Sequence, residues 1–253
     1  MAELRRLLIS PERLGDATAP LALETQERRY LERVLRLRPG ARFGISDGAG
    51  RLYDASLLEQ GLAAIDGLIE HHERQQPQLV LLQGLMRRDL EITLRMATEL
   101  GVDRIVPMQA DRSVLAPREQ RYERWISQLT EATEQCERLW LPQLEPVQSA
   151  VDALSSPAPE SGQRWIGVTR MPGAMPLMQA IDLCSTHDQC WQIACGPEGG
   201  WSPAELEVAA MNGWRPVSLG PTILRASTAA VAALSLLQHR RHGLNASGHQ
   251  PSA

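Results

Sequence analysis

The sequence predicts an α/β protein in which a mainly parallel sheet, covered by helices, follows a small and mainly β module. From about residue 79 onward, short apolar runs typical of buried strands alternate with stretches of helical spacing. The first 70 or so residues contain a hairpin pattern instead, and the polar stretch 71–77 separates the two regions. We therefore expect domains at 1–74 and 75–243, with a disordered tail at 244–253.

In the first region, apolar residues recur at helical spacing between Thr25 and Leu37. Thr25 is the expected helix cap, and Pro39 with Gly40 stops the helix. The pattern then changes to strands over 41–46 and 52–57 around an Asp-Gly turn, which favours the positive φ angles of a hairpin.

Besides a helix that begins after residue 202, the second region is predicted to contain five strands and three helices. The strands are expected at 79–84, 104–108, 164–168, 191–195 and 215–219, and the helices at 88–100, 118–138 and 227–242. The last helix carries an alanine-rich face that suits very close packing, either inside its own subunit or against a second copy.

Composition excludes several classes of protein. A chain that is 43% hydrophobic and 22% charged, without an apolar run long enough for a membrane span or a secretory signal, is expected to be a globular protein of the cytoplasm. The formal net charge of -4 argues against a protein that coats nucleic acid indiscriminately. Any RNA site must therefore be a local patch of arginines.

The four cysteines form no C-x-x-C pair and have no clustered histidines beside them. Cytosolic cysteines ordinarily stay reduced, so we expect buried free thiols and no metal site.

The most informative segment is the glycine loop from Gly196 to Gly200, which follows a buried strand. The helix after it begins with a capping box in which Ser202 is the cap and Glu205 reaches back, with Pro203 at the first helical position. A strand, loop and helix start in this order make a ligand site at the carboxyl edge of a parallel sheet. Neither a P-loop nor G-x-G-x-x-G is present, and a tight turn that serves only the backbone is an equal alternative.

A second strand runs into a glycine-containing loop between Leu219 and Ala229. Arg225 stands where the following helix begins, near the positive end of the helix dipole, so its position favours an anionic partner. Pairing with a nearby surface carboxylate is the simpler alternative. A third strand end, Val168 to Arg170, is on its own no more than a loop.

Together the two glycine loops resemble the S-adenosylmethionine-binding knot of SPOUT methyltransferases, and the chain as a whole resembles the RsmE family. The resemblance rests on residues 196–200, Ser202 and Glu205, residues 219–221 and 223–225, Thr228 and Ala229, residues 98–102, 112–114 and 134–136, and, in the first module, residues 33–36, Asp47, Gly48 and Tyr53. These matches keep the family's order from about Arg28 to Gln238.

The resemblance implies a SPOUT trefoil-knot domain preceded by a PUA-like RNA-binding β-barrel. It implies S-adenosylmethionine-dependent methylation of N3 of a uridine in small-subunit (16S) ribosomal RNA, and a homodimer. The implied cofactor-binding residues are Val168, Gly196, Pro197, Glu198, Gly199, Gly200, Leu219, Gly220, Ile223, Leu224, Arg225 and Thr228. Arg225 and Glu198 are the candidate catalytic residues, and Arg28, Arg29, Arg33, Arg36, Arg87 and Arg88 the candidate RNA-binding residues.

The chain departs from the family pattern at four positions. Thr222, Ser227, Met96 and Glu137 stand where the pattern has arginine, glutamate, lysine and glycine. Two alternative functions therefore stay open. One is a non-catalytic RNA-binding or ribosome-assembly protein that keeps the fold, and the other is a SPOUT methyltransferase for another RNA site.

Overall fold

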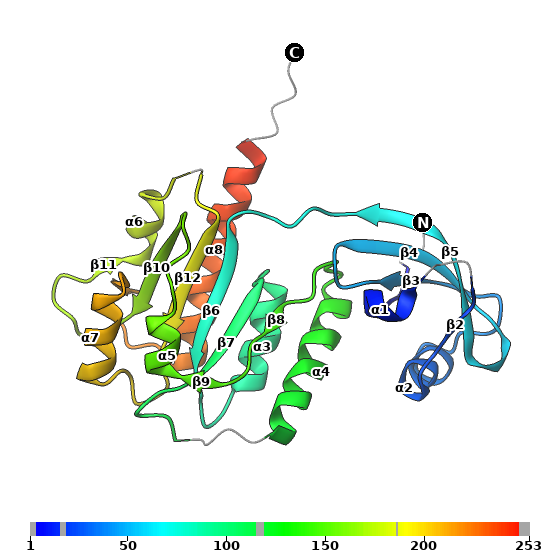
Figure 1. Cartoon of the computed structure of the whole chain (residues 1–253), viewed down its shortest axis with the longest axis horizontal. Helices are drawn as coiled ribbons and strands as arrows, with labels where there is room; N and C mark the ends of the chain where they lie inside the picture. Colours follow the sequence, from blue (N-terminus) through cyan, green and yellow to red (C-terminus); the bar gives the residue numbers. More distant parts are fainter. Residues whose placement is uncertain (1–3, 16–18, 115–118, 186, 248–253) are drawn as a thin grey trace, which may run out of the picture. The chain divides into compact units, whose positions relative to one another are not determined.

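The computed structural model describes residues 4–15, 19–114, 119–185 and 187–247, and Figure 1 traces the chain. It divides into two compact units, one of residues 1–74 with 130–141, the other of residues 75–129 with 142–253. Helix α4 (Glu119–Gln135) contributes residues to both units. Assignment of 130–141 to the first unit was not expected from the sequence.

The first unit is built on a five-stranded sheet of order β1-β3-β4-β5-β2. Its elements are β1 (Arg6–Leu8), α1 (Pro11–Leu14), β2 (Leu21–Ala22), α2 (Thr25–Arg29), the π-helix η1 (Tyr30–Val34), β3 (Arg42–Ser46), β4 (Arg51–Leu57), the 3-10 helix η2 (Glu59–Gly61) and β5 (Leu62–His71). β3 and β4 form the predicted hairpin, and Asp47 Oδ1 accepts the Ala49 and Arg51 N–H groups across its turn. The predicted β module is confirmed.

The helix predicted from Thr25 begins there, but its cap is Glu24. Glu24 and Glu27 form a reciprocal capping box, in which the Glu24 N–H donates to Glu27 Oε2 at 2.7 Å. The last turn widens into a π-helix, a local feature that apolar spacing alone does not reveal. Leu31 becomes fully buried, while Val34 stays exposed.

Glu137 has φ +60°, in the left-handed region that glycine adopts most readily. This conformation explains why a glycine suits the position. The Glu137 side chain pairs with Arg6 (Nη2 to Oε2, 2.8 Å), and the same guanidinium donates to the Glu137 carbonyl. The ion pair offsets part of the backbone strain.

Glu134 is a half-buried carboxylate whose Oε1 accepts the Leu8 N–H at 2.7 Å. Burial raises the pKa of Glu134 to about 7, against the lowering effect of the Leu8 N–H and with the added repulsion of Glu131 and Glu27. A folded-state pKa above the ordinary 4.5 means that the folded protein holds this proton more tightly than the unfolded chain. This contribution to stability is present at low pH and is lost as the pH rises through about 7.

We expect Glu134→Gln to remove that loss, because a neutral amide keeps an acceptor for the Leu8 N–H. The melting temperature of the variant relative to wild type should therefore rise between pH 5 and pH 8 in thermal denaturation. Glu73→Gln, at a side chain that is 90% exposed, is the control and should show no such trend. A pH-independent difference between Glu134→Gln and wild type would contradict the assignment.

The second unit contains an eight-stranded sheet in which every pairing is parallel, as predicted for the larger region. The strand order is β11-β13-β10-β12-β6-β7-β8, with β9 also paired to β7. The strands are β6 (Gln78–Gly84), β7 (Arg104–Gln109), β8 (Gln143–Leu144), β9 (Gln148–Ser149), β10 (Gly162–Gly167), β11 (Met175–Pro176), β12 (Cys190–Cys195) and β13 (Arg215–Ser218). The five predicted strands are all present.

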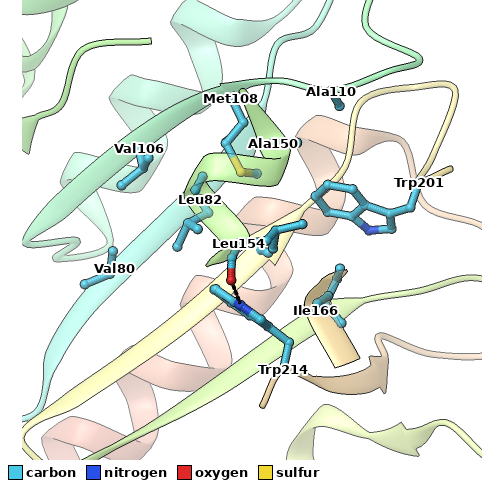
Figure 2. Close-up of a cluster of buried hydrophobic side chains, with 13 residues drawn as sticks. Val80, Leu82, Val106, Met108, Ala110, Ala150, Leu154, Ile166, Trp201 and Trp214 are labelled. Carbon is cyan, nitrogen blue, oxygen red and sulfur yellow. Dashed lines mark hydrogen bonds between the residues drawn. The ribbon is translucent and has the colours of Figure 1, made fainter. Parts of the chain in front are cut away.

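Helices cover both faces of this sheet (Figure 1). α8 (Ala226–Ser247) packs on β6 and β12 together with α3 (Leu90–Glu99) and α6 (Leu177–Asp182), and α5 (Ala150–Ser155) packs with α7 (Pro203–Met211) and against β7. Figure 2 shows the core on the α5 side, where the Trp214 indole N–H donates to the Leu154 carbonyl at 2.9 Å. The large apolar side chains there hold the strand ends in place.

α8 differs from its prediction in two respects. It continues through Ser247, so the predicted tail from 244 is wrong over its first four residues, and residues 248–253 lie outside the described residues. Its small face is buried within the chain itself, because Ala230, Ala233 and Leu234 have no exposed surface. That face is therefore unavailable to a second copy.

In its C-terminal half, α8 is joined to the sheet by a buried ion pair. Arg241 Nη1 lies 2.6 Å from Asp103 Oδ2, and both side chains are at most 4% exposed. The guanidinium also donates to the Gly101 carbonyl, and Asp103 accepts the Leu79 N–H. The pair joins α8 to the starts of β6 and β7.

Among the described residues, no helix is both long and apolar enough to span a membrane.

Candidate active site

The carboxyl ends of four neighbouring strands surround a cleft of about 950 Å³. The lining comes mainly from residues 86–89 after β6, 167–171 after β10, 195–201 after β12 and 218–227 after β13. These strands are consecutive in the sheet in the order β13-β10-β12-β6, so their loops lie side by side. The carboxyl edge of a parallel sheet is where α/β proteins bind ligands.

The β12 loop is held at its far end by the predicted capping box of α7. Ser202 Oγ accepts the Glu205 N–H, and Glu205 Oε2 accepts the Ser202 N–H at 2.7 Å. Glu205 is fully buried, and its second oxygen accepts the Asp111 N–H at 2.9 Å. One carboxylate therefore ties the β12 loop to the loop after β7.

The β12 loop is also attached to β10. The Trp201 indole N–H donates to the Gly167 carbonyl at 2.9 Å, and Trp201 is 8% exposed. Val168 continues the β10 ladder because its N–H donates to the Val217 carbonyl. The β12 loop is thus fixed to the end of β10 by a side chain, and the end of β10 is fixed to β13 by a backbone hydrogen bond.

Glycine is required at two positions of these loops. A Cβ at Gly199 would lie 2.7 Å from Arg112 Cβ and 3.0 Å from the Arg112 carbonyl oxygen, so the segments pass too closely for a side chain. Gly220 has φ +133°, which other residues rarely adopt, and no atom lies within 4 Å of the position its Cβ would take. The Gly220 backbone is therefore open for approach by a ligand.

Glu198 lines the cleft, but one of its oxygens is already used. Glu198 Oε1 accepts the Arg87 N–H at 2.9 Å, which joins the β12 loop to the β6 loop. The sequence indicated Glu198 as a contact to cofactor or base, and that role stays a prediction. The hydrogen bond supports a second role, in which Glu198 positions the segment that carries Arg87 and Arg88.

All the predicted cofactor-binding residues line the cleft except Thr228. The predicted role of Thr228 in cofactor binding therefore has no support from the cleft lining. Successive residues of a helix are turned by about 100°. Ala226 and Ala229, one turn apart at the start of α8, therefore face the cleft while Thr228 does not. Thr222 and Ser227, two of the departures from the family pattern, both line it.

The cleft is rich in arginines. Arg87 and Arg88 belong to its lining, as do Arg225 and two arginines to which the sequence assigned no role in the site, Arg112 and Arg170. Among the described residues of the lining, two are carboxylates, Asp89 and Glu198. The sequence feature that could have indicated a site role for Arg170 is its position just past a predicted strand. The other predicted RNA-binding residues, Arg28, Arg29, Arg33 and Arg36, are exposed on the first unit.

The apolar part of the lining includes a side chain that is unusually exposed for its type. Ile223 is 59% exposed although it belongs to the cleft, and Val168, Leu219 and Leu224 are half-buried around the same space. An exposed isoleucine beside open backbone provides an apolar surface for a flat ring.

Neither thiol chemistry nor a metal cluster is evident at the cleft. All four cysteines are free, and Cys195 alone is fully buried, where burial raises the pKa of its thiol to about 12 and keeps it protonated. The other three are half-buried rather than buried as predicted. In the described part of the chain, no three His, Cys, Asp or Glu side chains are grouped to hold a metal ion.

Comparison with known proteins agrees with this architecture. Residues 73–238 match the family model of the RNA methyltransferase domain, and residues 23–61 match that of the RNA methyltransferase PUA domain. The fold and the cleft are therefore those of an RNA methyltransferase.

Individual relatives of this chain identify a narrower class of RNA methyltransferase. Ribosomal RNA small subunit methyltransferase E of Synechocystis sp. is 35% identical over 233 residues, covering 91% of this chain and 76% of the relative. The protein of the same name from Aquifex aeolicus is 28% identical, covering 91% and 97%. A crystal structure of this enzyme from Neisseria gonorrhoeae, bound to S-adenosyl methionine, has a TM-score of 0.80 and 27% identity, covering 94% of this chain and 98% of the other.

The chain belongs to the ribosomal RNA small subunit methyltransferase E family, and the resemblance to RsmE is confirmed.

Proposed function

We propose that S-adenosylmethionine binds in the cleft and that its methyl group is transferred to N3 of a uridine in small-subunit ribosomal RNA. The observation that carries this proposal is the meeting of the β10, β12 and β13 loops around one cleft of about 950 Å³ at the carboxyl edge of the sheet. Ligand pockets typically measure about 300–1,000 Å³, so the cleft has room for a nucleoside-sized donor and part of an acceptor.

The residues present fit this donor. Ile223 and Leu224 offer apolar surface to the adenine, while Gly220 and the loop of residues 196–200 offer backbone groups at close range. When bound, S-adenosylmethionine supplies a methyl group on a sulfonium: the N3–CH₃ bond forms as the S–CH₃ bond breaks, and N3 loses its proton to a base. This chain's own residues must orient the uracil and favour its deprotonated form.

Arg225 is the best candidate for that task. It is exposed in the cleft immediately before α8, and no ion-pair partner for it exists among the described residues. Negative charge that develops on the uracil as N3 loses its proton would be stabilised by a guanidinium at this place. Glu198 serves mainly as a positioning residue through the Arg87 N–H, and a direct contact to the base is its secondary role.

We expect Arg225→Ala to lower the rate of methyl transfer about tenfold to hundredfold. This factor corresponds to the loss of one charge-assisted hydrogen bond of about 1.5–3 kcal/mol in the transition state. The effect should appear in kcat under saturating RNA and donor, measured with tritiated S-adenosylmethionine. Arg124→Ala removes another exposed guanidinium in the same unit, away from the cleft lining, and should leave kcat unchanged. A change confined to the KM of the donor would rule out the proposed role.

The RNA is proposed to contact arginines of both units. Arg87 and Arg88 would meet phosphates at the cleft, and Arg28, Arg29, Arg33 and Arg36 would do so on the first unit. Arg28 is partly neutralised by Glu32 at 2.9 Å, so it should contribute least. Access to N3 further requires that the target base leave its local stack.

We further propose that the protein acts in the cytoplasm as a homodimer. Because Ala230 and Ala233 are buried within the chain, the alanine face of α8 gives the dimer no support, and its interface must use other surface. Sedimentation equilibrium tests this directly: a mass near 28.0 kDa at micromolar concentration would exclude the dimer.

Two measurements separate this function from a non-catalytic relative of the same fold. Calorimetry should detect S-adenosylmethionine binding to the wild-type protein, and absence of binding would remove the basis for the enzyme. Deletion of the gene should then abolish one arrest site of reverse transcriptase on small-subunit ribosomal RNA, because N3-methyluridine cannot pair. An unchanged arrest pattern would refute the uridine assignment, and loss of a different mark would identify another RNA site.

A further inference from the structure

Arg170 follows β10, the strand between the two that carry the proposed donor and acceptor residues. β10 pairs with β12 on one side and with β13 on the other, and neighbouring strands lie about 4.8 Å apart. The start of the Arg170 loop is held on both sides, by Trp201 at the Gly167 carbonyl and by the Val168 N–H at Val217. Arg170 therefore leaves a fixed strand end and lines the cleft.

The backbone of Arg170 is in an unfavourable conformation for an arginine. Its φ is +55°, in the left-handed region, and it is the sole arginine with positive φ among the described residues of the second unit. Glycine or asparagine would adopt this conformation with less strain. Residues held in such conformations are concentrated at functional sites, where the surrounding structure maintains them.

The charge of Arg170 is not neutralised by any residue that the structure describes. No described residue forms an ion pair or a side-chain hydrogen bond with Arg170 or Arg225, and both are exposed. The two carboxylates of the lining, Asp89 and Glu198, come from the β6 and β12 sides instead. Two unpaired guanidinium groups in the lining of one cleft, from the loops that follow the neighbouring strands β10 and β13, repel one another unless an anion lies between or beside them.

The methyl donor cannot be the anion that accounts for both arginines. S-adenosylmethionine carries an ammonium, a sulfonium and one carboxylate, so its net charge is positive, and its single negative charge cannot neutralise two guanidinium groups. An RNA strand presents a phosphate at every nucleotide, and planar arginines bind phosphates through paired hydrogen bonds. RNA is therefore the ligand that matches the charge of this side of the cleft.

We infer that Arg170 binds a phosphate of the RNA strand beside the target nucleotide and thereby positions the base, a role that rests on the proposed function. Arg170 is a positioning residue. Arg225, which immediately precedes α8, acts at the uracil. The strained backbone keeps Arg170 in the cleft lining, which accounts for an arginine at a position where a glycine would fold with less strain.

The test uses Arg170→Asn and Arg170→Lys in the full-length protein with its ribosomal RNA substrate. Asparagine tolerates the left-handed backbone but removes the charge, so Arg170→Asn should unfold at the same or a higher temperature while RNA affinity falls about tenfold at moderate salt. The slope of log affinity against log salt should shrink by about 0.7–0.9, the value for one lost phosphate contact. Arg170→Lys should keep that slope.

Arg95→Gln is the control for removing one positive charge. Arg95 is exposed on α3 beside Glu99 and lies outside the cleft lining, so this variant should retain wild-type affinity and salt slope. An equal loss of RNA affinity in Arg95→Gln would show that the effect of Arg170→Asn comes only from the change in net charge, and would overturn the inference.

Two further outcomes would also overturn it. A weaker affinity of Arg170→Asn for S-adenosylmethionine, measured by calorimetry without RNA, would place the guanidinium at the donor. Unchanged RNA affinity and salt slope would leave Arg170 without a role in RNA binding. Methyl transfer by the wild type to the same RNA is measured alongside these affinities. Absence of transfer would show that the proposed function fails, independently of the result for Arg170.

Discussion

Gly199→Trp should abolish binding of S-adenosylmethionine, with a loss of affinity of more than about 100-fold. Even the first carbon of the new side chain would lie 2.7 Å from Arg112 Cβ and 3.0 Å from a backbone oxygen, so the β12 loop must move away from the loop after β7. The proposed donor site is made of the backbone of this loop, and a displacement of about 1 Å can cost about 100-fold at such a site. Isothermal titration calorimetry measures the loss.

The matched control is Glu207→Trp, which places the same bulky ring at an exposed position of α7 outside the cleft lining. It should bind the donor as the wild type does. Far-ultraviolet circular dichroism and thermal unfolding must show that Gly199→Trp remains folded, because only a folded variant reports on the loop. Normal affinity for S-adenosylmethionine in a folded Gly199→Trp protein would show that the donor does not bind at residues 196–200.

Arg241→Met is expected to destabilise the protein by about 3–5 kcal/mol, the usual effect of removing one partner of a buried ion pair. Asp103 is 4% exposed and would lose the guanidinium 2.6 Å away. The carbonyl of Gly101 would lose its donor as well. Urea denaturation measures the change in the free energy of unfolding.

Arg124→Ala is the surface counterpart, since Arg124 lies 2.8 Å from Glu91 but its side chain is 68% exposed. Such pairs contribute about 0–1 kcal/mol, so this variant should unfold almost as the wild type does. In a double-mutant cycle, Asp103→Asn should restore part of the stability lost in Arg241→Met, because a neutral amide depends less on the guanidinium than the carboxylate does. Additive losses would show that the two side chains are not coupled.

Local patterns predicted much of the fold because they depend on neighbours in sequence. The capping box of Ser202 and Glu205 requires residues three positions apart, and the hairpin turn at Asp47 and Gly48 requires only its own backbone angles. The same reasoning missed the Glu24 cap, since glutamate is an uncommon cap, and the left-handed backbone of Glu137, whose cost is offset by an arginine 131 residues away.

By itself, the sequence determined the order of strands and helices, the glycine loops after β12 and β13, and a family resemblance that the comparisons confirm. Only the tertiary structure decided which strand ends meet. The order β13-β10-β12-β6 places β10, which precedes Arg170, between β13 and the strand that leads into the glycine loop, while the rotation of α8 takes Thr228 out of the cleft lining. The physical reason is that pairing between distant strands, and burial against distant helices, depend on contacts between residues that no local pattern connects.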